Sequence, residues 1–344
     1  MGVTKIKCLV WDLDNTLWNG TLLEDPVVRL RAEAPEVIRE LDARGILHSI
    51  ASKNDFESAM KQVRDFHLED YFLYPQIGWH PKSDSIKAIA QSLNIGLDAI
   101  AFMDDQPFER EEVRHSLPEV ACYDASCMPR LLGVEEFQPL FVTEDSRRRR
   151  QMYQQDAHRQ REESSFSGPK ESFLKTLGMQ IQIALAREED LARAEELTVR
   201  THQLNTTGQT YTYAELAGFC HSDRHRLLVV GLEDKHGSYG TVGLTLLECE
   251  PHSWRIKMLL MSCRVMSRGV GGLVLTYLRK AALARGMELL ADWVPNERNR
   301  MMLVTYRFAG FQDFQREGER HLLRNTLEKI PDYPDYFTLR HPGL

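Results

Sequence analysis

A short apolar run at residues 6–11 leads directly into Asp12-Leu13-Asp14-Asn15-Thr16. The run has the length and composition of a buried strand in a parallel sheet. In such a sheet, ligands bind beyond the carboxyl ends of the strands. Two carboxylates at alternate positions there predict a phosphate site that combines a nucleophile, a second acid and a magnesium site. For this pentapeptide taken alone, a solvated strand end rich in aspartate is the other interpretation.

Three further elements follow in a fixed order, and each supplies a group that phosphoryl transfer through an aspartyl-phosphate needs. A second apolar run at 46–51 ends in Ser52, whose hydroxyl can hold a phosphate oxygen. Lys82 comes later and can neutralise the charge of the phosphate and the nucleophile together. A third run at 99–103 ends in Asp104-Asp105, whose oxygens suit a hard cation.

This ordered set of motifs resembles the haloacid dehalogenase superfamily of phosphatases. The resemblance implies that Asp12 is the nucleophile and Asp14 the general acid/base. It also implies a magnesium site formed by Asp12, Asp14 and Asp104, with Asp105 beside it in a supporting role. The phosphate-binding residues that it implies are Ser52, Lys53, Asn54 and Lys82. The implied fold class is α/β, a doubly wound Rossmann-like domain.

The spacing of the motifs predicts that this domain has no large cap. Between Asp14 and Ser52 the chain has room for a flap around residues 18–20 and a helix around residues 35–44, but not for a separate lid domain. We therefore expect an open site. Such a site tolerates a macromolecular substrate or needs a second domain to cover it.

Composition limits the remaining possibilities. The chain has 344 residues and 42% hydrophobic content, which favours two domains. Its net charge of −7 argues against nucleic-acid binding, because phosphate neutralisation needs a basic surface. No apolar stretch reaches the length of a membrane span and the start lacks a secretory pattern, so we expect a cytoplasmic protein without a membrane partner. The six cysteines show no C-x-x-C pairing, which indicates neither a zinc site nor a disulfide framework.

The pattern divides the chain into a phosphatase domain at 1–145, a charged helical linker at 146–170 and a second domain at 171–344. The linker carries the arginine run at 147–150, and a stripe that docks a partner is its other interpretation. In the second domain, apolar periodicity predicts a strand, a helix, three antiparallel strands and another helix, at residues 179–183, 188–201, 227–232, 240–247, 254–260 and 273–285.

This order of elements resembles the acetyltransferase fold of the GNAT superfamily, an α+β domain. In that superfamily an Arg/Gln-x-x-Gly-x-Gly/Ala turn holds the pyrophosphate of coenzyme A, and Arg264-x-x-Ser267-x-Gly269 is a degenerate version. A strand, this turn and a helix start would place backbone N–H groups around a phosphate. Because Ser267 departs from the pattern, the turn suits the single phosphate of a phosphopantetheine arm better than coenzyme A.

The two halves together resemble a narrower group, the FkbH family, over almost the whole chain. The motifs that carry this resemblance lie at residues 12–18, 52–54, 81–83, 104–110, 203–207, 262–265 and 268–270. Members of that family take a glyceryl unit from 1,3-bisphosphoglycerate, remove phosphate and load glycerate as a thioester on an acyl carrier protein. The product feeds polyketide extender units such as methoxymalonyl-ACP. The resemblance therefore implies Mg²⁺ as cofactor, and 1,3-bisphosphoglycerate and an acyl carrier protein with its phosphopantetheine arm as partners.

In the second domain, Cys263 is the candidate nucleophile, because it lies at a strand end beside Arg264 and ahead of a helix start. A buried strand cysteine is the other interpretation. The candidate residues for binding the carrier and its phosphopantetheine are Arg264, Arg268 and Gly269. An acidic carrier predicts a positive patch formed by Arg264, Arg268, Arg279 and Lys280. The candidate base or oxyanion donors are His202, Asn205 and His236.

Two other functions fit parts of the sequence. A magnesium phosphatase fused to a coenzyme A dependent N-acyltransferase would bind coenzyme A tightly, which Ser267 argues against. A non-enzymatic scaffold would carry a decayed phosphatase domain. The acidic and basic set is intact, however, at Asp12, Asp14, Lys82 and Asp104.

Overall fold

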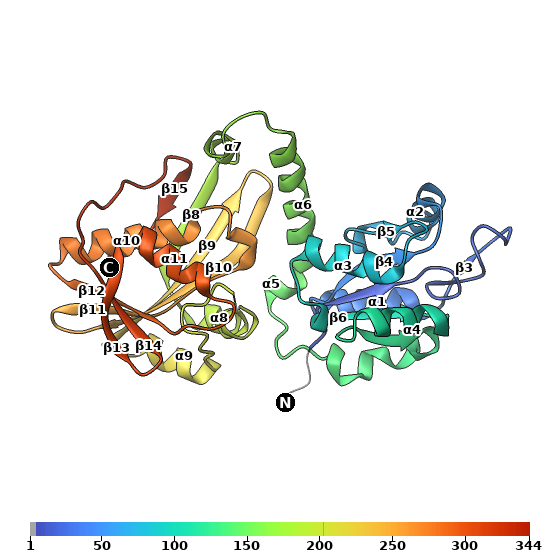
Figure 1. Cartoon of the computed structure of the whole chain (residues 1–344), viewed down its shortest axis with the longest axis horizontal. Coiled ribbons are helices and arrows are strands. Elements are labelled where there is room, and N and C mark those ends of the chain that lie inside the picture. Colours follow the sequence, from blue (N-terminus) through green and yellow to red (C-terminus); the bar gives the residue numbers. More distant parts are fainter. Residues whose placement is uncertain (1–4, 202) are drawn as a thin grey trace. The chain divides into compact units, whose positions relative to one another are not determined.

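The computed structural model describes residues 5–201 and 203–344, and it divides after Gln154 into two compact units (Figure 1). We call them the N-terminal unit and the C-terminal unit. The division lies inside helix α6 (Arg149–Ser165), within the segment 146–170 that the sequence predicts as a helical linker.

The N-terminal unit is built around a five-stranded sheet in the order β5-β4-β1-β6-β7, in which all neighbours are parallel. Its strands are β1 (Cys8–Trp11), β4 (Leu47–Ser52), β5 (Gln76–Ile77), β6 (Ile100–Asp104) and β7 (Ala121–Asp124). The chain adds strands to one side of β1 and then to the other. The end of β1 is therefore the topological switch point, where ligands of such sheets bind.

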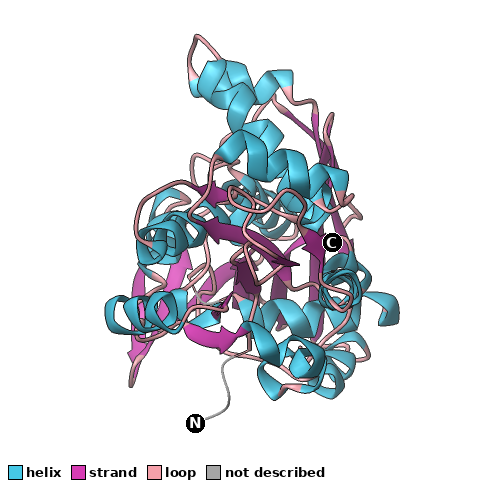
Figure 2. Ribbon diagram, turned by 90° about the vertical axis from the view of Figure 1, so that its right-hand side faces the viewer, coloured by secondary structure: helices cyan, strands magenta, loops and turns pink. Residues whose placement is uncertain are grey.

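Figure 2 shows the helices and strands of the whole chain. In the N-terminal unit, helices cover both faces of the sheet. They are α1 (Ala34–Ala43), α2 (Phe56–Asp65), α3 (Lys82–Leu93) and α4 (Pro107–Ser116). Leu9 and Trp11 of β1 pack with α1 and α2, whereas Cys8 and Val10 pack with α3 and α4. Alternate side chains of one strand thus enter two cores, as a doubly wound sheet requires. The predicted α/β fold class is confirmed.

The insertion between Asp14 and Ser52 is small. It consists of a hairpin of β2 (Trp18–Asn19) and β3 (Arg29–Leu30), followed by α1. The unit therefore has no large cap, as the motif spacing predicts. Short helices complete it: 3-10 turns at Glu69–Tyr71, Leu97–Ala99, Ala125–Gly133 and Glu135–Phe137, and α5 (Glu144–Arg147).

The C-terminal unit contains an eight-stranded sheet in the order β13-β14-β12-β11-β10-β9-β8-β15. Its strands are β8 (Met179–Leu185), β9 (His225–Asp234), β10 (Gly237–Cys249), β11 (Ser253–Met261), β12 (Glu288–Trp293), β13 (Phe311–Glu317), β14 (Arg320–Asn325) and β15 (Phe337–Arg340). The strands β8 to β11 form an antiparallel meander, which confirms the predicted one. Helix α10 (Val270–Ala284) then crosses over to β12, which is parallel to β11.

The remaining helices of this unit are α7 (Lys170–Thr176), α8 (Glu188–Arg200), α9 (Tyr213–Cys220) and α11 (Arg300–Phe308), with a 3-10 turn at Cys263–Val265. One face of the sheet packs with α8 and α9, and the other with α10 and α11. A meander followed by a strand–helix–strand crossover gives the α+β domain that the sequence predicts. None of the helices in the described ranges combines the length and the apolar composition that a membrane crossing needs.

The strands β11 and β12 diverge after a short parallel pairing. The segment 203–207 lies between them. The amide of Thr206 donates to the carbonyl of Leu259 at 3.0 Å, and its carbonyl accepts from the amide of Val294 at 3.0 Å. The segment thus satisfies backbone groups that the divergence would otherwise leave unpaired.

A buried histidine ties β4 to β1 and α1. The indole Nε1 of Trp11 donates to His48 Nδ1 at 3.0 Å, so the other ring nitrogen carries the proton and donates to the carbonyl of Ile38 at 3.0 Å. Burial lowers the pKa of His48 from 6.5 to about 4. The folded unit therefore holds this ring neutral.

We predict that this histidine makes the folded unit less stable as the pH decreases. Between pH 6.5 and pH 4 His48 binds a proton in the unfolded chain but not in the folded one. Its contribution to the free energy of unfolding is therefore full above pH 6.5 and is lost as the pH decreases toward 4. The loss from pH 7 to pH 5 should be about 2 kcal/mol. Urea unfolding of the parent and of His48→Gln, which keeps one donor and one acceptor, should show a smaller loss in the variant. The control variant is His115→Gln at an exposed histidine, and it should lose as much stability between pH 7 and pH 5 as the parent does. If His48→Gln also loses as much stability as the parent, the prediction is wrong.

Candidate active site

The motif residues meet at the carboxyl edge of the N-terminal sheet. Asp12 follows β1, Asp104 ends β6, and Lys82 begins α3. The register pairs Trp11 with Met103, which places the two carboxylates at adjacent strand ends. The Lys82 Nζ lies 2.7 Å from Asp12 Oδ1 and donates to Asp104 Oδ2. All three side chains are almost completely buried. The structure therefore joins the predicted nucleophile, phosphate-binding lysine and metal ligand in one ionic group.

Burial and mutual charge set the protonation of this group. Burial raises the pKa of Asp12 to about 7, an effect that Lys82 opposes and Asp104 increases. Burial also raises the pKa of Asp104, again against the effect of Lys82. Burial alone would lower the pKa of Lys82, but the two carboxylates raise it instead. The lysine thus stays cationic at neutral pH, whereas the carboxylates need further positive charge to remain fully ionised.

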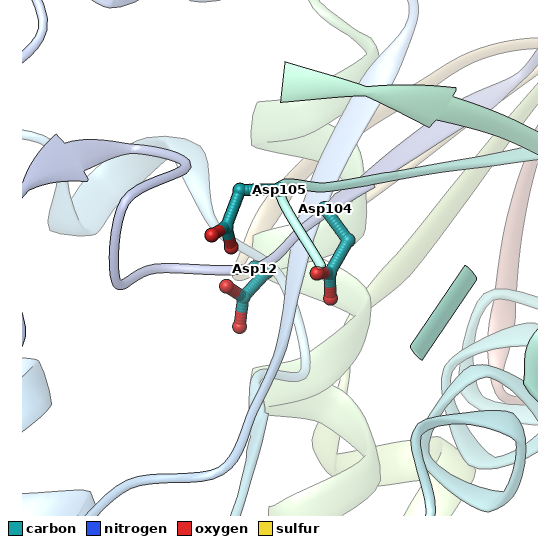
Figure 3. A group of neighbouring side chains, drawn as sticks. All are labelled: Asp12, Asp104 and Asp105. Carbon is teal, nitrogen blue, oxygen red and sulfur yellow. The ribbon is translucent and has the colours of Figure 1, made fainter. Parts of the chain in front are cut away.

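Asp12, Asp104 and Asp105 form a set of carboxylates suited to a metal ion. One oxygen from each lies within 4.8 Å of the others (Figure 3). Thr16 holds Asp105, because the Asp105 amide donates to Thr16 Oγ1 at 3.0 Å. The Gln106 amide donates to Asp104 Oδ1 at 2.8 Å. A hard cation such as Mg²⁺ prefers oxygen ligands of this kind, and its charge would hold the carboxylates ionised.

The side chain of Asp14 is not part of this carboxylate set, and its predicted role at the magnesium site stays a prediction. Its Oδ1 accepts from the indole of Trp18 at 2.8 Å and from the amide of Leu22 at 2.9 Å. Its Oδ2 accepts from the amide nitrogen of Asn54 at 2.9 Å. Both oxygens of the Asp14 carboxylate thus accept hydrogen bonds, and Asp105, predicted in a supporting role, contributes the third carboxylate of the set.

Of the three predicted phosphate-binding residues after β4, Ser52 and Asn54 are buried, whereas Lys53 is paired with another side chain. Ser52 is buried at the strand end. The Asn54 Oδ1 is buried and has no hydrogen-bond partner among the described residues, so it is free to accept from a ligand or a metal-bound water. The Lys53 ammonium pairs with Glu109 Oε1 at 2.7 Å. The sequence reasoning missed Glu109, whose only signal was its place in the 104–110 motif.

In the C-terminal unit, Cys263 begins the 3-10 turn that follows β11. Its thiol is half-buried and free. The amide of the preceding Ser262 donates to the carbonyl of Val242 at 2.7 Å, which fixes the strand end. The catalytic role of Cys263 stays a prediction.

The residues of the predicted phosphopantetheine site contact other parts of the C-terminal unit. Arg268 is 5% exposed, and its NH1 donates to Glu163 Oε2 at 3.0 Å. The NH2 of Arg264 donates to the carbonyl of Tyr239 at 2.7 Å. A Cβ on Gly269, which has φ +80°, would lie 2.8 Å from the hydroxyl of Tyr336. The predicted turn thus exists at the start of α10, with Arg268 paired to a carboxylate, and its role in binding stays a prediction.

The predicted positive patch for a carrier is not an exposed surface. Like Arg268, Arg279 is buried, and it donates to Asn325 and to the carbonyl of Glu328. Lys280 pairs with Asp332. Burial of the two arginines therefore corrects the prediction. Their hydrogen-bond acceptors, the Glu163 carboxylate for Arg268 and two neutral oxygens for Arg279, lie far away in the sequence.

Two of the candidate base and oxyanion donors, Asn205 and His236, make contacts within the C-terminal unit, and their catalytic roles stay predictions. Asn205 is fully buried, and its amide group binds the backbone of the turn through Thr207, Gly208 and Gln209. The ring of His236 lies 3.2 Å from Glu162. His202 lies outside the described residues.

Parts of the chain are similar to known proteins, although no family model matches it. Magnesium-dependent phosphatase 1 of Homo sapiens is 26% identical over 141 residues, which cover 36% of this chain and 76% of that protein. The N-terminal part of a Bacteroides fragilis protein, which contains a phosphatase domain and was solved with Mg, is 30% identical with a TM-score of 0.35, over 38% of this chain and 40% of that chain. The ribosomal-protein-S18-alanine N-acetyltransferase of Escherichia coli is 14% identical with a TM-score of 0.33, over 42% of this chain and 90% of its own.

We predict that Asp105→Asn weakens the binding of Mg²⁺, because a neutral amide replaces one of the three carboxylates at the site. The affinity measured by calorimetric titration should fall on the order of tenfold. Asp98→Asn, on the exposed 3-10 turn before β6, is the matched control and should bind Mg²⁺ as the parent does. Equal affinities in the parent and Asp105→Asn would remove Asp105 from the site.

Proposed function

We propose that the N-terminal unit is a magnesium-dependent phosphatase that acts through an aspartyl-phosphate on Asp12. The observation that carries this proposal is the buried lysine between Asp12 and Asp104 at the switch point of the sheet. Mg²⁺, held by Asp12, Asp104 and Asp105, would supply charge neutralisation for the phosphate and the nucleophile. A structural ion pair would not need a third carboxylate beside it.

In the first step, a carboxylate oxygen of Asp12 attacks the phosphorus and the bond to the leaving oxygen breaks. Asp14 gives its proton to that oxygen. Asp14 then takes a proton from water, the water oxygen attacks the phosphorus, and inorganic phosphate leaves as Asp12 is restored. Lys82 balances the negative charge on Asp12 and the phosphate, and three N–H donors fix the direction of the Asp14 carboxylate.

For the whole chain, we propose the glyceryl transfer that the resemblance to the FkbH family implies. The thiol sulfur of a carrier's phosphopantetheine, or of Cys263, attacks the acyl carbon of 1,3-bisphosphoglycerate. The bond from that carbon to the phosphate oxygen breaks, and phosphate leaves with the electron pair. The N-terminal unit then hydrolyses the remaining phosphomonoester, which is among the slowest groups to react in water. An uncapped site supports this proposal, because a carrier-bound substrate needs an open entrance.

A coenzyme A dependent N-acyltransferase is the alternative for the C-terminal unit. It would need the turn at 264–269 to hold a diphosphate. A diphosphate at that turn would have to displace Glu163 from Arg268 and fit beside the Tyr336 hydroxyl near Gly269. The single phosphate of a phosphopantetheine arm needs less space at the turn than the diphosphate of coenzyme A. We therefore prefer an acyl carrier protein to coenzyme A as the ligand of this unit.

We predict that Asp12→Asn abolishes phosphate release without unfolding the unit, because an amide cannot form the aspartyl-phosphate. The assay is magnesium-dependent release of inorganic phosphate from a small phosphate ester. Asp98→Asn should retain the parent's rate. Normal release by Asp12→Asn would refute the phosphatase assignment.

A second prediction concerns transfer. After incubation with 1,3-bisphosphoglycerate, intact-protein mass spectrometry should find a glyceryl adduct on the parent and glycerate on an acyl carrier protein. Cys263→Ser should lose both if the thiol is acylated, because a serine hydroxyl is a much weaker nucleophile at neutral pH. Cys249→Ser, at the end of β10, should keep both. Carrier loading by Cys263→Ser at the parent's rate would show that transfer is direct.

A further inference from the structure

The helix α6 brings a carboxylate to the turn at the start of α10. Glu163, near the end of α6, accepts a hydrogen bond from Arg268 at 3.0 Å. The arginine side chain is 6% exposed and its partner 32% exposed, so solvent reaches the pair from the glutamate side only. The arginine best placed to meet an anion at this turn is thus already paired inside the chain.

A separate set of contacts anchors α6 so that Glu163 stays in this position. Arg159 makes a two-bond pair with Asp234, at 2.8 Å for each bond, and also pairs with Asp156 at 2.8 Å. Its guanidinium lies 3.7 Å from the ring centre of Tyr239. Such paired, planar contacts of arginine are among the strongest in proteins. They hold the helix even when the contact at Glu163 is absent.

The turn has one donor that the present arrangement does not use. The NH1 of Arg264 is buried and has no hydrogen-bond partner among the described residues. Leaving such a charged donor unpaired costs free energy. Asp156 lies near enough to act electrostatically, and burial raises the pKa of that carboxyl. The turn therefore presents two arginines to an anionic ligand: Arg268, which is paired with Glu163, and Arg264, which has an unpaired donor. A ligand with more oxygens and more charge than one carboxylate could bind both.

We propose that Glu163 is a built-in competitor that occupies Arg268 until the phosphate of an incoming phosphopantetheine arm displaces it. This inference rests on the proposed function for the identity of the ligand. A phosphate ester carries more negative charge and more acceptor oxygens than a carboxylate. It can pair with Arg268 and also reach the unused donor of Arg264. Because desolvation offsets much of the attraction within a buried ion pair, the glutamate is replaceable at small net cost.

The test compares Glu163→Gln with Glu162→Gln. The neighbouring Glu162 pairs with Lys235 and His236 and not with Arg268, so it is a matched control on the same helix. Removing the competing charge should tighten the binding of 4′-phosphopantetheine, measured by calorimetric titration, on the order of tenfold in Glu163→Gln. Glu162→Gln should match the parent, and pantetheine without its phosphate should bind equally to all three proteins.

Parent-like affinity in Glu163→Gln, or an equal gain in Glu162→Gln, would overturn the inference. Glu163→Ala should show the same gain as the glutamine variant, and its failure to do so would count equally against the competitor. The titration needs neither glyceryl substrate nor phosphatase activity. A parent that loads no carrier, together with tighter binding in Glu163→Gln, would therefore contradict the proposed function and leave the competitor in place.

Discussion

The ionic group of Lys82, Asp12 and Asp104 is the constraint on which the N-terminal unit depends. The parallel register of β1 and β6 sets two carboxylates side by side in a buried place, where each disfavours the ionised form of the other. Without a cation, that arrangement would lose its charge or its structure. The first residue of α3 supplies the cation, so the helix start is fixed by the electrostatics of the strand ends. A bound Mg²⁺ would neutralise the remaining negative charge of the carboxylates.

The two aspartates of the first motif differ because their surroundings differ. Asp12 faces charged groups, whereas Asp14 faces N–H donors from Trp18, Leu22 and Asn54. Two of those donors belong to the short insertion around β2. The insertion is too small to be a lid, yet it directs the side chain that we assign as acid and base. Neighbouring carboxylates with distinct environments are what a reaction with separate nucleophile and proton donor needs.

The sequence predicted the sheet and its motif residues because both depend on local pattern, namely apolar runs that end in polar groups. It did not show that the side chain of Asp105, and not that of Asp14, groups with Asp12 and Asp104, because this depends on side-chain direction, which spacing does not fix. It also predicted an exposed positive patch. Arg268 is instead buried and paired with Glu163, a residue 105 positions earlier in the chain. The periodicity of a sequence does not reveal a partner at such a separation.

The motif at 203–207 shows how a structural requirement can resemble a catalytic one. Where β11 and β12 diverge, Thr206 pairs with both sides, and Asn299 donates to three backbone carbonyls around the segment. Backbone pairing of this kind explains buried polar residues without any chemistry. With Asn205 committed to its turn, Cys263 is the candidate of the C-terminal unit whose side chain has no hydrogen-bond partner among the residues that the structure describes. A thiol becomes an effective nucleophile when a base or a nearby positive charge helps it to ionise. Among the features of Cys263, its place at the end of β11 beside Arg264 is the one that argues for chemistry, and its role stays a prediction.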